Sequence, residues 1–202
     1  MTAGGGFRHL DEHGRASMVD VLSKPPTYRV ARASCRVRTS SAGLRLLRGA
    51  TGADSVSTAR TAGLEGAKRT PALIPLCHPI RLDSVLVDIS IGKAGVTITA
   101  TAETVERTGV EMEALTACAC AALSIVRTVL SVDPGACLDD LVLVHKSGGR
   151  SGTWNRGRDA LSLPPGSVPA DEGRHPGPHA SGRPGGRPGA GPLPRHRGGR
   201  AS

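Results

Sequence analysis

Aromatic residues are almost absent from this sequence, since Phe7, Tyr28 and Trp154 are the only ones among 202 residues. A folded core must therefore be built from aliphatic side chains, chiefly those of valine, leucine, isoleucine and alanine.

Long apolar runs are also missing. The longest, from residue 114 to residue 126, spans 13 residues and includes Thr116 and Ser124, whereas a membrane-spanning helix needs about 20 apolar residues. The N-terminal stretch MTAGGGFRHLDEHG has no apolar segment of the signal-peptide kind. The five cysteines are odd in number and form no CxxC pair, which argues against a disulfide scaffold or a zinc knuckle. We therefore expect a cytoplasmic protein without a membrane segment.

Positive charge is present in excess. Lysine and arginine number 26 against 17 acidic residues, a formal net charge of +9, which suits an anionic partner such as a phosphate-rich ligand or nucleic acid. The composition changes after Trp154, because residues 155–202 hold 11 Gly, 9 Pro and 8 Arg. Such a segment cannot bury enough apolar surface to offset its loss of conformational entropy. We therefore predict a folded domain at residues 1–154 and a disordered tail at residues 155–202.

Apolar and polar residues alternate in three stretches, which predict strands at residues 31–38, 84–91 and 96–103. A shorter strand is expected at residues 141–145, and GKAG (residues 92–95) predicts a tight hairpin. Helices are expected at residues 40–48, from the capping residue Asp54 to about Arg69 where Pro71 stops the helix, and at about 110–132. Small residues in the second helix favour close packing.

The predicted order of elements is β-α-α-β-β-α-β. Apart from an additional helix, this order is typical of a ferredoxin-like split βαβ sandwich in the α+β class. Such a sheet leaves one face open, and that face often packs against a second subunit.

Three loops carry candidate binding residues. LIPLCHP (residues 73–79) sets Cys77 and His78 between two prolines whose fixed φ angles stiffen the loop. A stiff loop that presents an imidazole suits ligand binding, and the alternative is a plain proline-rich connection with a surface histidine. In TGVEMEALTA, Glu111 and Glu113 stand at a strand-to-helix junction, where they can converge on one site. The alternative is that they are first-turn acids that favour the helix dipole.

The third loop is KSGGRSG (residues 146–152), which follows the fourth strand. Its Ser-Gly-Gly amides lie between Lys146 and Arg150, an arrangement that predicts an oxyanion or phosphate cradle. The alternative is a flexible basic turn. Lys68 and Arg69 add two cations at the end of the second helix. None of the patterns HExxH, GxGxxG and GxxxxGK[ST] occurs, and nothing in the sequence requires a metal site.

Together these segments resemble the cyclic pyranopterin monophosphate synthase family. The blocks HLDEHGRASMVDVLSKP, STARTAGLEGAKRTPALIPLCHP, RTGVEMEALTACACAALSI and LVLVHKSGGRSGTW follow that family's order and spacing over about residues 7–154. The resemblance implies a lyase of molybdenum cofactor biosynthesis. Such an enzyme rearranges a cyclised dihydro-GTP to the pyranopterin, closes a cyclic phosphate and releases pyrophosphate. It implies no cofactor, a ferredoxin-like fold, and a homohexamer built as a trimer of dimers with sites at subunit interfaces.

The resemblance also assigns roles to residues. The substrate-binding positions are Leu76, Cys77, His78, Met112, Glu113 and Lys146. The catalytic positions are Lys68, Glu111, Arg127, Leu130 and Arg150. Three of these depart from the family: Arg127 replaces an Asp proposed as general acid/base, whereas Leu130 and Arg150 each replace a Lys. Arginine keeps the charge of lysine but does not lose a proton in a protein.

Three functions stay open from the sequence. The first is a working synthase whose acid/base groups are relocated, and we expect its activity to be impaired by these substitutions. The second is a non-catalytic homologue that binds the nucleotide-derived ligand or pairs with an active paralogue. The third is a nucleic-acid-associated protein that uses its basic tail, although this tail lacks interleaved aromatic residues.

Overall fold

Five strands and four helices follow one another in the computed structural model, which describes residues 13–49 and 52–157. The strands are β1 (Thr27–Arg38), β2 (Ser84–Ile91), β3 (Val96–Glu106), β4 (Cys137–Ser147) and β5 (Trp154–Asn155). The helices are α1 (Ser41–Arg48), α2 (Gly52–Lys68), α3 (Thr70–Leu73) and α4 (Glu111–Val129).

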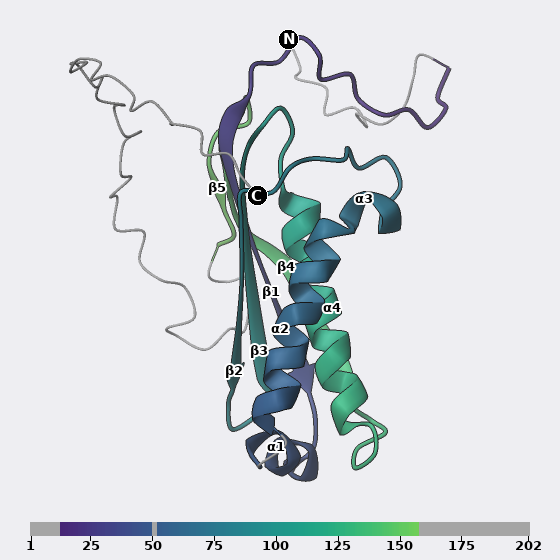
Figure 1. Ribbon diagram of the computed structural model, residues 1–202, viewed down its shortest axis with the longest axis vertical. Coiled ribbons are helices and arrows are strands. Elements are labelled where there is room, and N and C mark those ends of the chain that lie inside the picture. The colour runs from purple at the N-terminus through teal and green to yellow at the C-terminus, as the bar shows by residue number, and fades with distance from the viewer. Residues whose placement is uncertain (1–12, 50–51, 158–202) are drawn as a thin grey trace, which may run out of the picture. The chain divides into compact units, whose positions relative to one another are not determined.

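The strands form one antiparallel sheet in the order β2-β3-β1-β4-β5 (Figure 1). Strand β3 lies between β1 and β2 and is antiparallel to both, as the split βαβ arrangement requires. The predicted hairpin at residues 92–95 is confirmed, because the Gly92 amide donates to the Gly95 carbonyl at 2.9 Å. The α+β class and the ferredoxin-like sandwich are therefore confirmed.

Helices α2 and α4 lie on one face of the sheet (Figure 1). Alternation along β1 turns Ala31, Ala33, Cys35 and Val37 toward these helices, and all four side chains are fully buried. Apart from Glu113, the buried residues of α4 are also small or aliphatic, as the scarcity of aromatic residues predicts. The predicted close packing of α2 is found as well. A Cβ added at Gly66 would lie only 2.6 Å from the Sγ of Cys120 on α4.

Several details differ from the sequence prediction. Helix α2 begins at Gly52, so Asp54 lies in its first turn instead of capping it. Pro71 follows the end of α2 as predicted, but it also stands in the first turn of α3. Backbone N–H groups in a first turn make no hydrogen bond within the helix, so a proline is tolerated there. Strand β4 is longer than predicted at both ends. Strand β5 is too short to show an alternation pattern, and it pairs with His145 and Lys146 of β4.

Helix α4 is long and apolar enough, by length and composition alone, to cross a membrane. Half of it is buried inside the protein, where it packs against the sheet and α2, as the core helix of a folded domain does. The described residues end at Gly157. The tail predicted at residues 155–202 lies almost entirely outside them.

Candidate functional site

A cavity of about 660 Å³ opens where β1 and α4 begin. It is lined by the segment before β1, the loop after α3, the junction of β3 with α4, and the turn after β4. Eight of the eleven predicted site residues meet there, although they come from three separate segments of the sequence. They are Leu76, Cys77, His78, Glu111, Met112, Glu113, Lys146 and Arg150.

The loop after α3 brings Cys77 and His78 to this cavity. Leu76, the residue before them, has a φ of 62°, a left-handed conformation that is uncommon for any residue other than glycine. Such a backbone costs about 1–2 kcal/mol for an L-residue. Strained residues of this kind cluster at ligand-binding sites, so the conformation of Leu76 favours a binding role for the loop over a plain connection.

Glu111 and Glu113 lie in the first turn of α4, and both line the cavity, so the two roles considered for them are compatible. The Glu111 carboxylate accepts a hydrogen bond from Lys146 Nζ at 3.2 Å. Glu113 is only 3% exposed. The pKa of Glu113 is raised to about 7, chiefly by burial; a backbone N–H partly offsets this rise, and the Glu111 charge adds to it. Glu113 can therefore exchange a proton near neutral pH.

Cys77 shares this environment. Burial, and then the Glu113 carboxylate, raise the pKa of the Cys77 thiol above its ordinary value of 9.0. The thiolate is the nucleophilic form of cysteine. Cys77 therefore remains a neutral thiol at physiological pH, which suits contact with a ligand better than attack on it.

The turn after β4 contains three glycines with positive φ: Gly148 (92°), Gly149 (72°) and Gly152 (64°). A Cβ at Gly148 would collide with the Tyr28 carbonyl oxygen, so the turn rests against the start of β1. Arg150 stands exposed beside the cavity. Glycine amides next to a guanidinium form the arrangement expected of an anion cradle.

Three further cations, which no sequence motif indicated, also line the cavity: Lys24, Arg29 and Arg107. Arg107 donates from Nη1 to the Leu22 carbonyl at 2.9 Å, which fastens the segment before β1 to the end of β3. One signal for Arg29 was available, since it continues the alternating series of Ala31 and Ala33 on the buried face of β1. An arginine on such a face suggests a polar site beyond the core.

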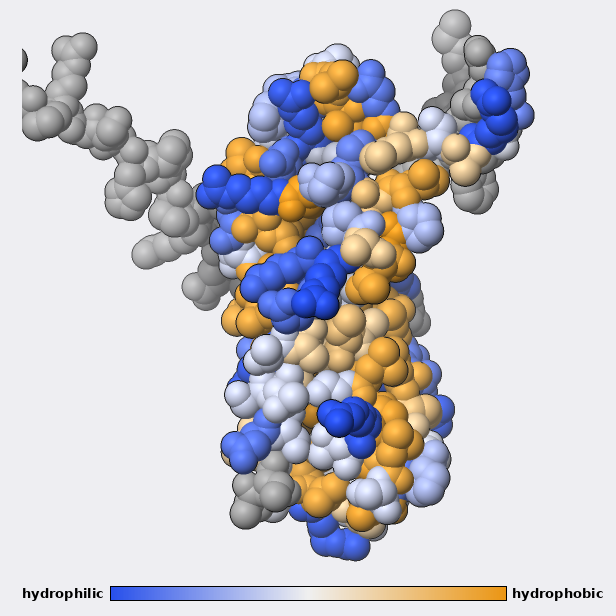
Figure 2. Space-filling view, turned by 45° about the vertical axis from the view of Figure 1, so that its right-hand side comes forward, coloured by the Kyte–Doolittle hydropathy of each residue, from blue (hydrophilic) through white to orange (hydrophobic). Residues whose placement is uncertain are grey.

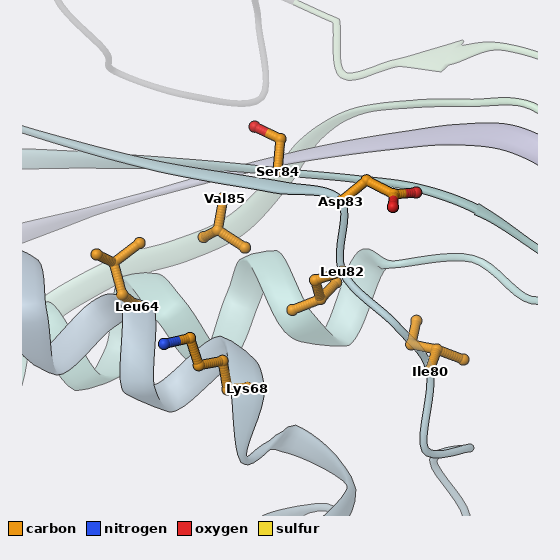
Figure 3. A pocket seen from close by; sticks show the side chains of 7 residues that line it. All are labelled: Leu64, Lys68, Ile80, Leu82, Asp83, Ser84 and Val85. Atoms are coloured by element: carbon orange, nitrogen blue, oxygen red, sulfur yellow. The ribbon is translucent and has the colours of Figure 1, made fainter. Parts of the chain in front are cut away.

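Lys68 does not line this cavity. It lies beside a smaller one of about 380 Å³, between the last turn of α2 and the start of β2 (Figure 3). There Leu64, Leu82 and Val85 turn toward one another, and Lys68 lies at the end of the helix. Its Nζ forms an ion pair with Glu65 at 3.2 Å, and its side chain is 65% exposed.

Arg127 and Leu130 lie at the opposite end of α4 from Glu111. The 16 residues from Glu111 to Arg127 correspond to about 24 Å along a helix that rises about 1.5 Å per residue. Neither side chain lines the cavity within one chain.

The site combines cations, backbone amides and a carboxyl group that titrates near neutrality. Such a set can bind a polyphosphate, stabilise negative charge that develops on it, and move a proton. Within residues 13–49 and 52–157, no group of three or more His, Cys, Asp or Glu side chains is arranged to hold a metal ion.

The chain is similar to several proteins named cyclic pyranopterin monophosphate synthase. It is 52% identical over 150 residues to the cyclic pyranopterin monophosphate synthase of Streptomyces coelicolor, which covers 73% of this chain and 88% of that protein. It is 50% identical over 155 residues to the synthase of Thermomicrobium roseum, with coverage of 75% and 93%. It is 48% identical over 154 residues to cyclic pyranopterin monophosphate synthase 2 of Mycobacterium bovis, with coverage of 75% and 92%.

A family model agrees with these relatives. The model of the MoaC family matches residues 18–149. These residues include most of the cavity lining, from the segment before β1 to the glycine turn after β4. The resemblance stated from the sequence is therefore confirmed, and the chain belongs to the MoaC family.

Proposed function

We propose that the chain binds a cyclised dihydro-GTP in the 660 Å³ cavity and converts it to cyclic pyranopterin monophosphate, with release of pyrophosphate, at a strongly reduced rate. The observation that carries the proposal is the convergence of the phosphate cradle with His78 and Glu113 in one cavity. The names of the relatives support the same reaction.

The chemistry of the reaction explains why these groups are needed. Closing the cyclic phosphate breaks the bond to pyrophosphate, and negative charge grows on the leaving group. Lys146, Arg150 and the glycine amides supply fixed positive charge for that group, which stabilises it without reorganisation of water. Glu113, with its pKa of about 7, supplies a proton donor or acceptor for the rearrangement that precedes closure.

We attribute the reduced rate to two substitutions at the C-terminal end of α4. By resemblance, an Asp and a Lys of the family correspond to Arg127 and Leu130. Arg127 cannot act as a general acid/base at neutral pH, and Leu130 carries no titratable group. Loss of one such group commonly costs about 10²–10⁴ in rate. We therefore place the defect in the reaction centre and not in substrate binding.

A complete site needs a second copy of the chain, because positions 127 and 130 lie far from the cavity of their own chain. Three exposed apolar residues mark one face of α4: Met112, Leu123 and Leu130. Their spacing of eleven and seven residues puts them on one side of the helix. Figure 2 shows apolar surface along this helical side of the molecule. We propose that this face pairs with a second copy in a cytoplasmic homohexamer.

Arg127 also favours a second candidate function, that of a non-catalytic homologue. A protein that only binds the nucleotide-derived ligand, or that pairs with an active paralogue, needs the cradle but not the acid/base pair. Both candidate functions predict binding of the nucleotide-derived ligand, but only the synthase predicts its turnover.

Calorimetry with a non-hydrolysable GTP analogue tests the binding that both candidates share. The unmodified chain should bind, and its affinity should fall as salt screens the phosphates. Arg150→Ala should weaken binding, whereas Arg60→Ala, on the exposed side of α2, should not. Binding that is indifferent to both salt and Arg150 would remove the phosphate cradle from the proposal.

A further inference from the structure

Arg29 occupies an unusual place in β1. Its side chain lies on the strand face that carries Ala31, Ala33 and Cys35, which are fully buried under the helices. Arg29 stands one step before this series, next to the junction that leads into α4, and it lines the cavity. The buried face of the strand therefore ends in a guanidinium beside the site.

The guanidinium of Arg29 touches two walls of the cavity. Nε donates to the Glu106 carbonyl at 2.9 Å, and Nη2 donates to the Arg107 carbonyl at 3.0 Å. The first carbonyl belongs to the last residue of β3 and the second to the residue after it, a few residues before Glu111. Arg29 thus fixes the segment from which the acidic residues of the site project.

The third nitrogen of Arg29 lies under the glycine turn. A Cβ added at Gly149 would lie 2.9 Å from Arg29 Cζ and would collide with Nη1. A side chain at this position would push the guanidinium aside, and the positive φ of Gly149 (72°) favours glycine as well. A planar group that uses one edge for two carbonyls and packs under a turn is available from arginine but not from lysine.

We propose that Arg29 is a positioning residue for the triphosphate, because it fixes the distance between the Gly148–Arg150 cradle and the Glu111 wall. The inference rests on the proposed function, since it concerns the same cavity and the same anionic ligand. Arg29 acts on the reaction through the cradle amides and Arg150, which it holds in place for the phosphates.

Calorimetry with inorganic triphosphate, a probe that needs no turnover, tests this role. Arg29→Lys keeps the charge but loses the bonds to both carbonyls. We expect it to weaken triphosphate binding about tenfold, the scale of one lost hydrogen bond to a charged group. The matched control is Arg32→Lys. Arg32 stands on the opposite face of β1, where its Nε donates to Thr101 Oγ1 at 3.3 Å, and we expect unchanged affinity. Millimolar guanidinium should restore binding to Arg29→Ala but not to Arg150→Ala.

A second pair of variants guards against a general loss of folding. Both substitutions, Gly149→Ala and Gly152→Ala, force alanine into a positive φ. At position 149 the added methyl group also meets the Arg29 guanidinium, whereas at position 152 it meets no other atom within 4 Å. We expect Gly149→Ala to lose more triphosphate affinity than Gly152→Ala. In a chain that already carries Arg29→Ala, we expect Gly149→Ala to cause a smaller further loss, because the effects of residues in contact are not additive.

The outcomes separate this inference from the proposed function. If the unmodified chain binds triphosphate and Arg29→Lys binds it equally well, Arg29 is not a positioning residue, while the proposed function stands. Equal losses in Gly149→Ala and Gly152→Ala would also overturn the inference. If the unmodified chain binds neither triphosphate nor the GTP analogue, the proposed function and the role of Arg29 fall together.

Discussion

Glu113 shows, at the scale of a single residue, how burial and chemistry oppose each other. Its side chain is almost fully buried, yet it lines a cavity surrounded by cations. Burial favours the neutral acid, and the result is a pKa of about 7 in place of the ordinary 4.5. The fold keeps a proton on this group where a surface glutamate would have lost it.

This pKa predicts a pH dependence of stability. The folded chain holds the Glu113 proton up to about pH 7, whereas the unfolded chain releases it near 4.5. The folded state therefore binds more protons between these values, and the free energy of unfolding falls as the pH rises through this window. Above it, the contribution of Glu113 is constant. Glu113→Gln removes this contribution.

Urea unfolding at about pH 5 and about pH 8, at one protein concentration, measures the effect. We expect the free energy of unfolding of Glu113→Gln, relative to that of the unmodified chain, to be higher at the higher pH. The other carboxyl groups are common to both proteins and cancel in the comparison. An equal difference at both pH values would mean that Glu113 titrates near its ordinary value.

Individual site residues were predictable to different degrees. His78, Glu111 and Arg150 were found because short motifs surround them. Arg29 was not, because the alternation of small apolar residues placed the strand start at Ala31. No pattern within one segment could show that Lys68 would face a different cavity, since that depends on the packing of α2 against β2.

Helices α2 and α4 approach each other closely, at the scale of the element, because Gly63 and Gly66 carry no side chain. At Gly66 an added Cβ would lie 2.8 Å from Cys120 Cβ and 3.1 Å from the Thr116 carbonyl oxygen. Neither contact can be relieved by a flexible side-chain end, so one helix must shift.

We therefore expect Gly66→Ala to destabilise the fold by about 1–3 kcal/mol, as overpacking in a core commonly does. The expectation is distinctive because alanine is the better helix former by about 1 kcal/mol. Thr61→Ala, on the exposed side of α2, is the control and should change stability by less than about 0.5 kcal/mol. Chemical denaturation measures both, and a stabilised Gly66→Ala would show that the helices are not in tight contact.

Elements with a strong period were predictable, and irregular ones were not. The strands β1, β2 and β3 follow from alternation, and the glycines of α2 indicated its close packing. Helix α3 is not predictable from Pro71 alone, because a proline that ends one helix is also favoured at the start of the next. The glycine turn at residues 148–152 has no period, and the carbonyl of Tyr28 that it rests on comes from the other end of the chain.

Assembly is the feature of the whole molecule that the account depends on. Positions 127 and 130 lie far from the cavity of their own chain, and we propose that a partner subunit completes the site. We expect light scattering to show an oligomer at micromolar concentration, with a hexamer as the expected size. Leu123→Lys, at the middle of the exposed apolar face of α4, should shift the mass toward smaller species, whereas Thr58→Lys on the exposed side of α2 should not. A stable monomer of the unmodified chain would contradict this expectation.

The central claim is that the binding cavity is intact while the reaction centre is disabled at Arg127 and Leu130. The most direct test is turnover of the cyclised dihydro-GTP by the unmodified chain and by the double variant Arg127→Asp with Leu130→Lys, in one assay. We predict that the unmodified chain is slower than an ordinary family member by at least about 10²-fold, and that the double variant gains activity. Turnover of the unmodified chain at the rate of an ordinary family member would contradict the claim and place the acid/base chemistry in other residues.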